Sequence, residues 1–381
     1  MGSLLSPWIG GQGTFVPTVF FPTDGPLTKE ISRSGINCDF FPMVESLERI
    51  GDSPLGNVGI GSRFWQYGLA LPGLAWTVWK WRKRFGKSNV KWIHSNGAKT
   101  HILASWSVPV NIPVFWHLHD FVGERPMVRK LLRIAWRPGI QALAISKAVA
   151  DDFSNIVPKC PIRVWNNTID TVKFYPENLD GSWLDHLAGF SHGFNGLRVG
   201  MVATYARWKG QDVFLRACSK ILEEYSGNVR FYIIGGPVYQ TPGSQWTIED
   251  LEGMIQNLGL KETVGLIPFQ SDTARVYQSL DVVVHASIRR EPFGLVIGEA
   301  MACGKPVVAA LRGGAAEVGR SGLDCLNHQP GDAESLSSAI VSLLNSEKLR
   351  DKIGKAARER IVNSFGQERI FQNWRELIGE I

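Results

Sequence analysis

The alternation of short apolar runs with longer helical patterns constrains the fold of this chain more than any other feature. Runs such as TVFFP (18–22), IPVFWHLHD (112–120) and DVVVHAS (281–287) are typical of buried strands, and QDVFLRACSKILEEY (211–225) has apolar residues at helical spacing. Strands that alternate with helices form parallel sheets, because each helix returns the chain to the same edge. We therefore predict an α/β fold with ligand sites at the carboxyl ends of the strands.

The alternation is interrupted at NLDGSWLDHLAGFSHGFNG (178–196), which contains four glycines. A chain of 381 residues is long for a single core, so we place a domain boundary here. The predicted architecture is two Rossmann-like domains, 1–178 and 197–365, whose parallel sheets face a central cleft and which are joined by a linker at 179–196. We expect a C-terminal helix, about 366–381, to pack back on the first domain.

Cysteine usage and charge narrow the class of protein. Five scattered cysteines without metal-ligand spacing predict a reduced, cytosolic protein without disulfides or structural zinc. The opening residues do not have the pattern of a signal peptide, and the best apolar stretch, 69–79, is interrupted by Pro72 and Gly73. Residues 1–180 carry a net charge of +7 and ten of the 14 tryptophans, whereas residues 181–381 carry −1. We therefore expect the two halves to have different partners.

The stretch EPFGLVIGEAMACGKPVVAA, which begins at Glu291, places carboxylates at both edges of an apolar segment. Glu291 is expected in the loop after a strand, and Glu299 one turn inside the following helix. The amides of Phe293, Gly294 and Leu295 would then be the unpaired N–H groups of a helix N-terminus, which attract a phosphate. Gly294 would let the ligand approach closely. Carboxylates on either side would accept hydrogen bonds from the hydroxyls of a sugar and a ribose joined by a diphosphate.

A loop charge and a solvated helix glutamate are the plain alternative, but the length of the motif argues against it. The stretch closely resembles the E-x7-E signature of family 4 of the retaining GT-B glycosyltransferases, and RGGAAEVGRSGLDCLNHQPGD (312–332) resembles the G-G-x-x-E segment and glycine-rich turn that follow it. The resemblance spans about residues 18–381. It implies a GT-B enzyme that transfers a sugar from a nucleotide-sugar with retention, with Glu291 on the donor-sugar hydroxyls and Glu299 on the ribose.

The resemblance also assigns cations to the donor diphosphate. In ATYARWKGQDVF, Lys209 matches the family's lysine, but the usual arginine position is occupied by Thr204. We expect Arg207 to supply the missing charge. We also expect Leu266 and Phe269 among the donor-binding residues.

The histidine of WHLHDF that precedes the aspartate, His119, matches the family's histidine near the reacting bond, although a lone histidine at a strand end is more often structural. No D-x-D triplet, the motif with which GT-A enzymes hold a divalent ion, occurs in the chain. Arg207, Lys209 and the helix dipole would neutralise the leaving diphosphate instead. We therefore predict metal-independent transfer with no cofactor beyond the co-substrate, a UDP-sugar.

The N-terminus departs from the family pattern. Family members open with a strand and a glycine-rich loop, whereas here 17 residues precede the first convincing strand at 18–22. The first strand of the family fold is therefore expected to be missing or rebuilt.

Two segments of the first half, WTVWKWRKRFGKSNVKW (76–92) and ERPMVRKLLRIAWRP (124–138), mix cations with tryptophans and aliphatic residues. Such segments suit the surface of an anionic membrane, and the alternative is a core-facing apolar stripe with an ordinary basic face. No module that binds nucleic acid accompanies the charge, so we do not expect that partner. A glycan or lipid-linked acceptor at the cytoplasmic face of the membrane would fit.

We therefore predict a retaining, metal-independent hexosyltransferase of polysaccharide or glycoconjugate synthesis. Two alternatives stay open: a catalytically silent subunit that binds a nucleotide-sugar or glycan, which the N-terminus and Thr204 favour, and a GT-B epimerase that acts on the nucleotide-sugar itself.

Overall fold

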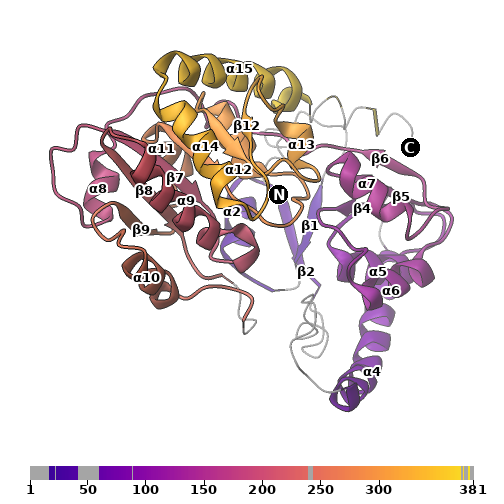
Figure 1. Cartoon of the computed structure of the whole chain (residues 1–381). Coiled ribbons are helices and arrows are strands. Elements are labelled where there is room, and N and C mark those ends of the chain that lie inside the picture. Colours follow the sequence, from indigo (N-terminus) through magenta and orange to yellow (C-terminus); the bar gives the residue numbers. More distant parts are fainter. Residues whose placement is uncertain are drawn as a thin grey trace. The chain divides into compact units, whose positions relative to one another are not determined.

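The computed structural model describes most of the chain, and the chain divides into two compact α/β units (Figure 1). The described residues are 17–21, 23–41, 60–87, 89–238, 243–369, 372 and 376–377. The units are Met1–Asn166 with Ile370–Ile381, and Asn167–Arg369. Residues 1–16, which carry the expected N-terminal departure, and most of the expected C-terminal helix lie outside the described residues.

The first unit contains two parallel sheets within its described residues. The smaller sheet pairs β1 (Thr18–Phe21) with β2 (Asn37–Phe40), and α2 (Pro26–Arg33) connects them. The larger sheet has the order β3 (Ile93–Asn96), β4 (Val114–Leu118), β5 (Ile140–Ala144), β6 (Ile162–Val164). The other helices are α4 (Ile60–Phe85), α5 (Ala98–Ser107), α6 (Pro126–Ala135) and α7 (Lys147–Ser154). The predicted alternation of strands and helices is confirmed here.

Helix α4 continues through Pro72, so the proline that interrupts the apolar stretch 69–79 does not end the helix. A proline inside a helix costs about 3 kcal/mol, which packing elsewhere on the helix must offset. Trp81 and Phe85 provide such packing, because their rings lie 4.9 and 5.4 Å from that of Phe41. No helix in the described part of the chain is long and apolar enough to cross a membrane.

The second unit is built around a six-stranded parallel sheet with the order β12-β11-β10-β7-β8-β9. Its strands are β7 (Leu197–Val202), β8 (Val229–Gly235), β9 (Val264–Pro268), β10 (Val282–His285), β11 (Val307–Ala309) and β12 (Leu326–Asn327). This is the order of the doubly wound Rossmann fold, in which the direction of winding reverses between the first and fourth strands. Here those strands are β7 and β10, so a ligand site is expected where these two strands end.

The helices of the second unit form two groups. They are α8 (Ser182–Leu187), α9 (Gln211–Glu224), α10 (Ile248–Asn257), α11 (Thr273–Gln278), α12 (Leu295–Ala302), α13 (Ala315–Val318), α14 (Ala333–Leu344) and α15 (Glu347–Phe365). Helix α9 packs against α10 and α14, and α12 packs against α11 and α15. The strand residues between them are fully buried, as in Val282, Val283 and Val284. Continuous apolar strands of this kind are typical of a parallel sheet covered on both faces.

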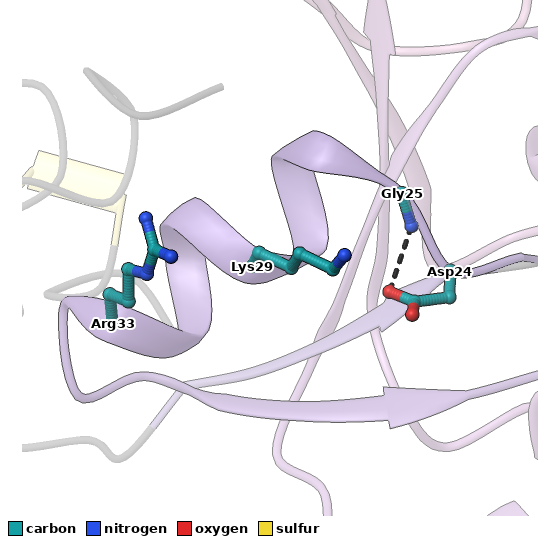
Figure 2. Close-up of a pocket in the computed structure, with 4 residues that line it drawn as sticks. All are labelled: Asp24, Gly25, Lys29 and Arg33. Carbon is teal, nitrogen blue, oxygen red and sulfur yellow. Dashed lines mark hydrogen bonds between the residues drawn. The ribbon is translucent and has the colours of Figure 1, made fainter.

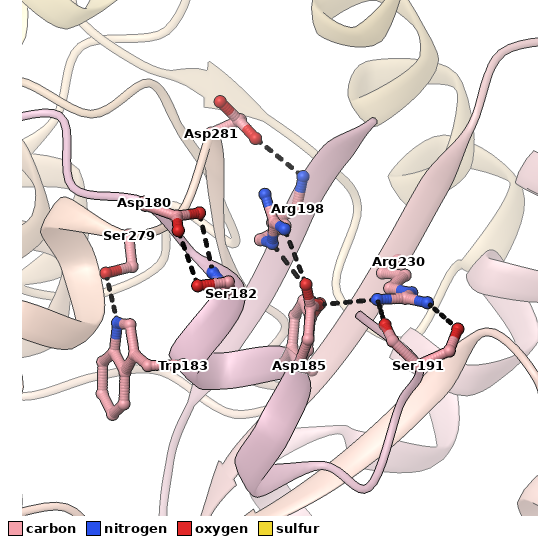
Figure 3. Close-up of polar contacts among 10 residues, drawn as sticks. Asp180, Ser182, Trp183, Asp185, Ser191, Arg198, Arg230, Ser279 and Asp281 are labelled. Atoms are coloured by element: carbon pink, nitrogen blue, oxygen red, sulfur yellow. Dashed lines mark hydrogen bonds and ion pairs between the residues drawn. The ribbon is translucent and has the colours of Figure 1, made fainter. Parts of the chain in front are cut away.

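Residues 179–196 belong to the second unit rather than forming a linker between two domains. Helix α8 brings Asp185, which is 1% exposed, against the sheet. There its carboxylate pairs with Arg198 at 2.6 Å and with Arg230 at 3.1 Å (Figure 3). It also accepts the hydroxyl of Tyr232. Glycines suggested a linker, but this buried ion cluster fixes the segment on the sheet.

Candidate functional site

Two loops meet where β7 and β10 end, at the reversal point of the second unit's sheet. The loop after β7 contains a 3₁₀ turn, Arg207–Lys209, followed by Gly210. Gly210 has φ of +82°, and a Cβ atom there would lie 2.2 Å from the carbonyl oxygen of Ala286, which follows β10. Only glycine allows this approach, which brings Lys209 and Glu291 together.

Lys209 and Glu291 form a hydrogen-bonded ion pair at this point. Their side chains are 18% and 7% exposed. Burial alone would raise the pKa of Glu291, but the hydrogen bond from His285 and the charge of Lys209 outweigh it and hold that pKa below its usual range. Glu291 therefore remains ionised although it is buried.

His285 and Ser287, which the sequence prediction missed, contact the same glutamate. His285 Nε2 and Ser287 Oγ each lie 2.9 Å from Glu291 Oε1. Both side chains are buried. The available signal was the polar end of the run DVVVHAS, since polar residues directly after a buried strand point to a site.

Helix α12 begins beside Glu291, as predicted. Its N-cap is Gly294, with φ of +96°, and no side chain caps its first amides. Leu295 is 45% exposed, whereas the ring of Phe293 is buried and packs against Phe365 at 5.6 Å. Phe293 can therefore contribute only its backbone to a ligand site here. The uncapped N-terminus leaves N–H groups available for an anion.

Glu299 lies inside α12 and is bonded by Tyr277, which the sequence prediction also missed. The Tyr277 hydroxyl donates to Glu299 Oε2 at 3.0 Å. Burial raises the pKa of Glu299, and the hydrogen bond from Tyr277 opposes this only in part. Glu299 is thus a half-buried acceptor fixed by a neutral donor.

Arg207 is stacked rather than buried in an ion pair. Its guanidinium lies 3.6 Å from the centre of the Trp246 ring and 3.9 Å from the carboxylate of Asp250. The hydroxyl of Thr204, where the family pattern has arginine, is buried and has no hydrogen-bond partner in the described part of the chain. The cation expected in place of Thr204 is therefore present on the same loop, three residues later.

The remaining expected donor-binding residues lie on and after β9. Leu266 is within the strand and packs against the hydrophobic core of the unit. Phe269 directly follows the strand and is 73% exposed. Of the two, only Phe269 presents its ring to a ligand.

His119 belongs to the first unit, where it directly follows β4. Its Nε2 lies 2.8 Å from Asn96 Oδ1, at the end of the neighbouring strand β3. Its ring is 4.1 Å from that of His117, which in turn stacks on His94 at 5.0 Å. His119 is thus part of a histidine cluster, not the lone histidine that the sequence suggested.

Two cavities lie away from these residues. One, of about 400 Å³, is lined by Asp24, Gly25, Lys29 and Arg33 around α2 (Figure 2). The other, of about 790 Å³, lies at the end of the second unit's sheet where its strands begin, and its lining includes Lys305 and Arg358. Among the described residues, no group of three or more His, Cys, Asp or Glu side chains is arranged to hold a metal ion.

Two family models match this chain, one over most of each structural unit. Residues 193–360 match the family model described as "Glycosyl transferases group 1". Residues 27–173 match the model described as "Glycosyltransferase Family 4". The two models together cover the ends of β7 and β10 and the histidine cluster.

Individual relatives are similar at lower identity. N-acetyl-alpha-D-glucosaminyl L-malate synthase of Bacillus anthracis is 24% identical over 77% of this chain and 76% of its own length. D-inositol 3-phosphate glycosyltransferase of Mycobacterium marinum is 37% identical, over 39% of this chain and 30% of its own length. Among solved structures, HepE of Anabaena in complex with UDP-glucose has a TM-score of 0.77 at 22% identity and covers all of this chain and 94% of its own. Sucrose-phosphate synthase of Thermosynechococcus elongatus has a TM-score of 0.70 at 20% identity and covers 93% and 92%. The overall fold of the chain is therefore GT-B.

Proposed function

Because this chain belongs to the group 1 glycosyltransferases, we propose that it transfers a sugar from a UDP-sugar to a glycan or lipid-linked acceptor with retention of anomeric configuration. The observation that carries the proposal is the meeting of Lys209, Glu291 and the uncapped N-terminus of α12 at the reversal point of the sheet. Cations and free amides suit a diphosphate, and a buried ionised carboxylate suits hydroxyl groups. The UDP and UDP-glucose found in the Anabaena structures support this choice of donor.

Each residue of the site has one role in this proposal. Lys209, Arg207 and the amides of Phe293, Gly294 and Leu295 bind the diphosphate. Glu291 accepts hydroxyls of the donor sugar, Glu299 accepts those of the ribose, and Phe269 contacts the base. His119 lies at the reacting face.

The reaction exchanges one bond of the anomeric carbon for another on the same face of the sugar. The bond to the phosphate oxygen breaks, the acceptor oxygen bonds to the anomeric carbon, and the acceptor proton passes to the leaving phosphate. Positive charge at Lys209 and Arg207 would stabilise that leaving group as its charge develops. We therefore propose that the transfer needs no metal ion, and full activity in the presence of EDTA is the expected result.

A panel of nucleotide-sugars separates this proposal from its alternatives. Binding is measured first by thermal shift, since a ligand of the folded state raises the melting temperature. Slow release of free sugar from the bound donor, with the anomeric configuration read by NMR, is the expected result. Binding without any turnover would indicate a silent binding subunit, and a changed donor without an acceptor would indicate an epimerase.

We also propose that one face of α4 contacts an anionic membrane that carries the acceptor. Trp76, Trp79, Lys80 and Lys83 follow helical spacing and form this indole face. The two indoles are 46% and 59% exposed, and the ammonium groups of Lys80 and Lys83 lie 4.7 and 5.4 Å from them. Indoles suit the headgroup region, and each lysine near such a surface contributes about 1 kcal/mol.

Other aromatic and basic residues of the segment 76–92 have different partners. Trp81 is buried, Arg82 donates to the carbonyl of Trp106 at 2.9 Å, and Arg84 pairs with Asp39. The alternative predicted from the sequence, an apolar stripe that faces the core together with an ordinary basic face, is therefore also present on α4. The indole face is the part of α4 that we propose for a membrane.

Liposome co-sedimentation tests the indole face. We expect the protein to sediment with vesicles rich in phosphatidylserine at low salt, and to be released as salt screens the attraction. Lys80→Glu/Lys83→Glu should abolish sedimentation, whereas Lys348→Glu/Lys352→Glu on α15 is a matched control that should not. Equal loss in both pairs, or no sedimentation of the wild type, would indicate a soluble acceptor.

A further inference from the structure

One oxygen of Glu291 receives all of the hydrogen bonds to that carboxylate. Oε1 lies 2.9 Å from His285 Nε2 and 2.9 Å from Ser287 Oγ, and it also accepts the ammonium of Lys209. Within the described part of the chain, Oε2 has no hydrogen bond or ion pair. The carboxylate is therefore held by one oxygen, and the other is left for a ligand.

The three donors differ in how firmly they are placed. His285 and Ser287 are buried at the end of β10, and the carbonyl oxygen of His285 accepts from Ala310 N at 3.0 Å and from His328 Nε2 at 3.1 Å. Lys209 comes from the other loop on a flexible stem, with its ammonium 4.0 Å from the centre of the Trp208 ring. Two donors are thus fixed, and the charged one has room to move.

The backbone of Glu291 is fixed as well. Its N–H donates to the carbonyl of Arg312 at 3.1 Å, and its own carbonyl accepts from Gly314 N at 2.8 Å. Loss of the lysine contact would therefore leave the glutamate in position, held by its backbone and by His285 and Ser287.

We propose that Lys209 is shared in turn between Glu291 and the diphosphate of the donor, and that His285 and Ser287 are positioning residues that hold Glu291 after Lys209 has moved. The inference rests on the proposed function, because a diphosphate at the N-terminus of α12 needs the same ammonium that neutralises Glu291 in the empty site. Donor binding then uncovers the charge of Glu291 at the moment when sugar hydroxyls arrive.

The protonation of His285 fits this role. Its Nδ1 is buried and has no hydrogen-bond partner in the described residues, so a proton there would be an unsatisfied donor. A proton on Nε2 is satisfied, because it is donated to Glu291 Oε1 at 2.9 Å. This hydrogen bond keeps the carboxylate in place when Lys209 has moved.

A double-mutant cycle with UDP as the probe tests the shared lysine. If Lys209 must leave Glu291 to bind UDP, Glu291→Gln should tighten UDP binding about fivefold in calorimetry, because the ion pair no longer competes. In the Lys209→Met background the same substitution should change UDP affinity by less than about twofold. Glu299→Gln, at the other carboxylate, is the matched control and should weaken UDP binding.

The cycle distinguishes three failures. Simple repulsion between Glu291 and UDP predicts an equal or larger gain without Lys209, because the glutamate is then unneutralised; that result would overturn the shared lysine. Unchanged or weaker binding by Glu291→Gln would overturn it too. If the wild type binds no UDP-sugar at all, the proposed donor is wrong, and the shared lysine is not what has failed.

The positioning role of His285 is tested by comparing the effect of its substitution on kcat with the effect on KM for the donor. His285→Leu should lower kcat on the order of 10- to 100-fold, the effect of a small misplacement of a reacting group, and leave the donor KM within about twofold. His285→Gln, which keeps an N–H near the position of Nε2, should recover most of kcat. If His285 were merely structural, both variants would lose kcat equally and would bind UDP more weakly. That result would contradict the proposal.

Discussion

Two of the polar clusters in the described part of this chain accommodate buried polar groups in opposite ways, one by pairing charges and the other by keeping histidines neutral. In the second unit, Lys209 and Glu291 are both charged, and each neutralises the other. In the first unit, His101 and His117 are almost fully buried and form no ion pair with a carboxylate in the described part. Burial lowers the pKa of His101 to about 3 and that of His117 well below its usual value, so both are neutral. The comparison shows that one cluster keeps its buried charges by pairing them, whereas the other avoids buried charge by keeping its histidines neutral.

The largest expected effect is that of acid on the first unit, because its buried histidines stay neutral in the folded chain and take up protons on unfolding. An unfolded histidine binds a proton below pH 6.5, whereas these two remain neutral in the folded chain until about pH 3 or lower. Stability is therefore unaffected above pH 6.5 and falls as the pH drops below it. At pH 4.5 the two together should cost about 5 kcal/mol.

Urea unfolding followed by tryptophan fluorescence between pH 7.5 and 4.5 measures this loss. His117→Leu should make the dependence on pH shallower, and the other buried histidines, His94 and His119 among them, should keep the rest of it. An unchanged slope in that variant would assign the acid sensitivity to other groups.

The paired charges of the second unit should respond to removal of a partner instead. Asp185→Leu leaves Arg198 and Arg230 buried without a carboxylate and should cost about 4 kcal/mol of unfolding free energy. Asp180, an exposed carboxylate that accepts hydrogen bonds from Ser182, is the matched control. Equal costs for Asp185→Leu and Asp180→Ala in chemical denaturation would contradict the importance of the cluster.

The next largest effect concerns the cations proposed for the diphosphate. Arg207→Ala should lower kcat on the order of 10²-fold, the usual loss for one contact to developing charge. Trp246→Ala, which removes the ring beneath the guanidinium, should lower it about tenfold by releasing Arg207. Thr204→Arg in the Arg207→Ala background should recover part of the rate. Steady-state kinetics with saturating donor give all three values, and a fully active Arg207→Ala would leave Lys209 as the main cation.

The smallest expected effect is on UDP binding, and it separates the role of Glu299 from that of Glu291. Glu299→Ala should weaken UDP binding about tenfold with little change in kcat, because a ribose contact is made equally in the ground and transition states. Tyr277→Phe, which removes only the donor to Glu299, should weaken it about threefold. UDP titration by calorimetry checks both, and wild-type affinity in Glu299→Ala would refute the ribose assignment.

Much of this arrangement could be predicted from the sequence. The alternation of strands and helices, the start of α12 beside Glu291 and the nearness of Lys209 all follow from local patterns, because parallel strands end at one edge. Residues that support the site were harder to predict. Tyr277 and Trp246 contact Glu299 and Arg207 from other parts of the chain, and no local pattern indicates such contacts.

The domain boundary shows why composition misled the prediction. Four glycines near Asp185 looked like a linker, but the stability of that segment depends on Arg198 and Arg230, which lie on strands β7 and β8. Likewise, His119 could be read from a motif, whereas its neighbours His94 and His117 gather only through the register of β3 and β4. Contacts set by strand register cannot be read from one strand alone.

The ends of the second unit have a consequence for engineering. The N–H of Ile169, just after the chain enters this unit, donates to the carbonyl of Phe365, just before it leaves, at 2.8 Å, and Ile169 also pairs with Gly366. Entry and exit therefore lie side by side, and the unit is one uninterrupted stretch, 167–369. A segment with adjacent ends can be transplanted as a cassette with two splice points and no change in its internal connections. Exchange of this cassette among related enzymes should carry the choice of donor with it.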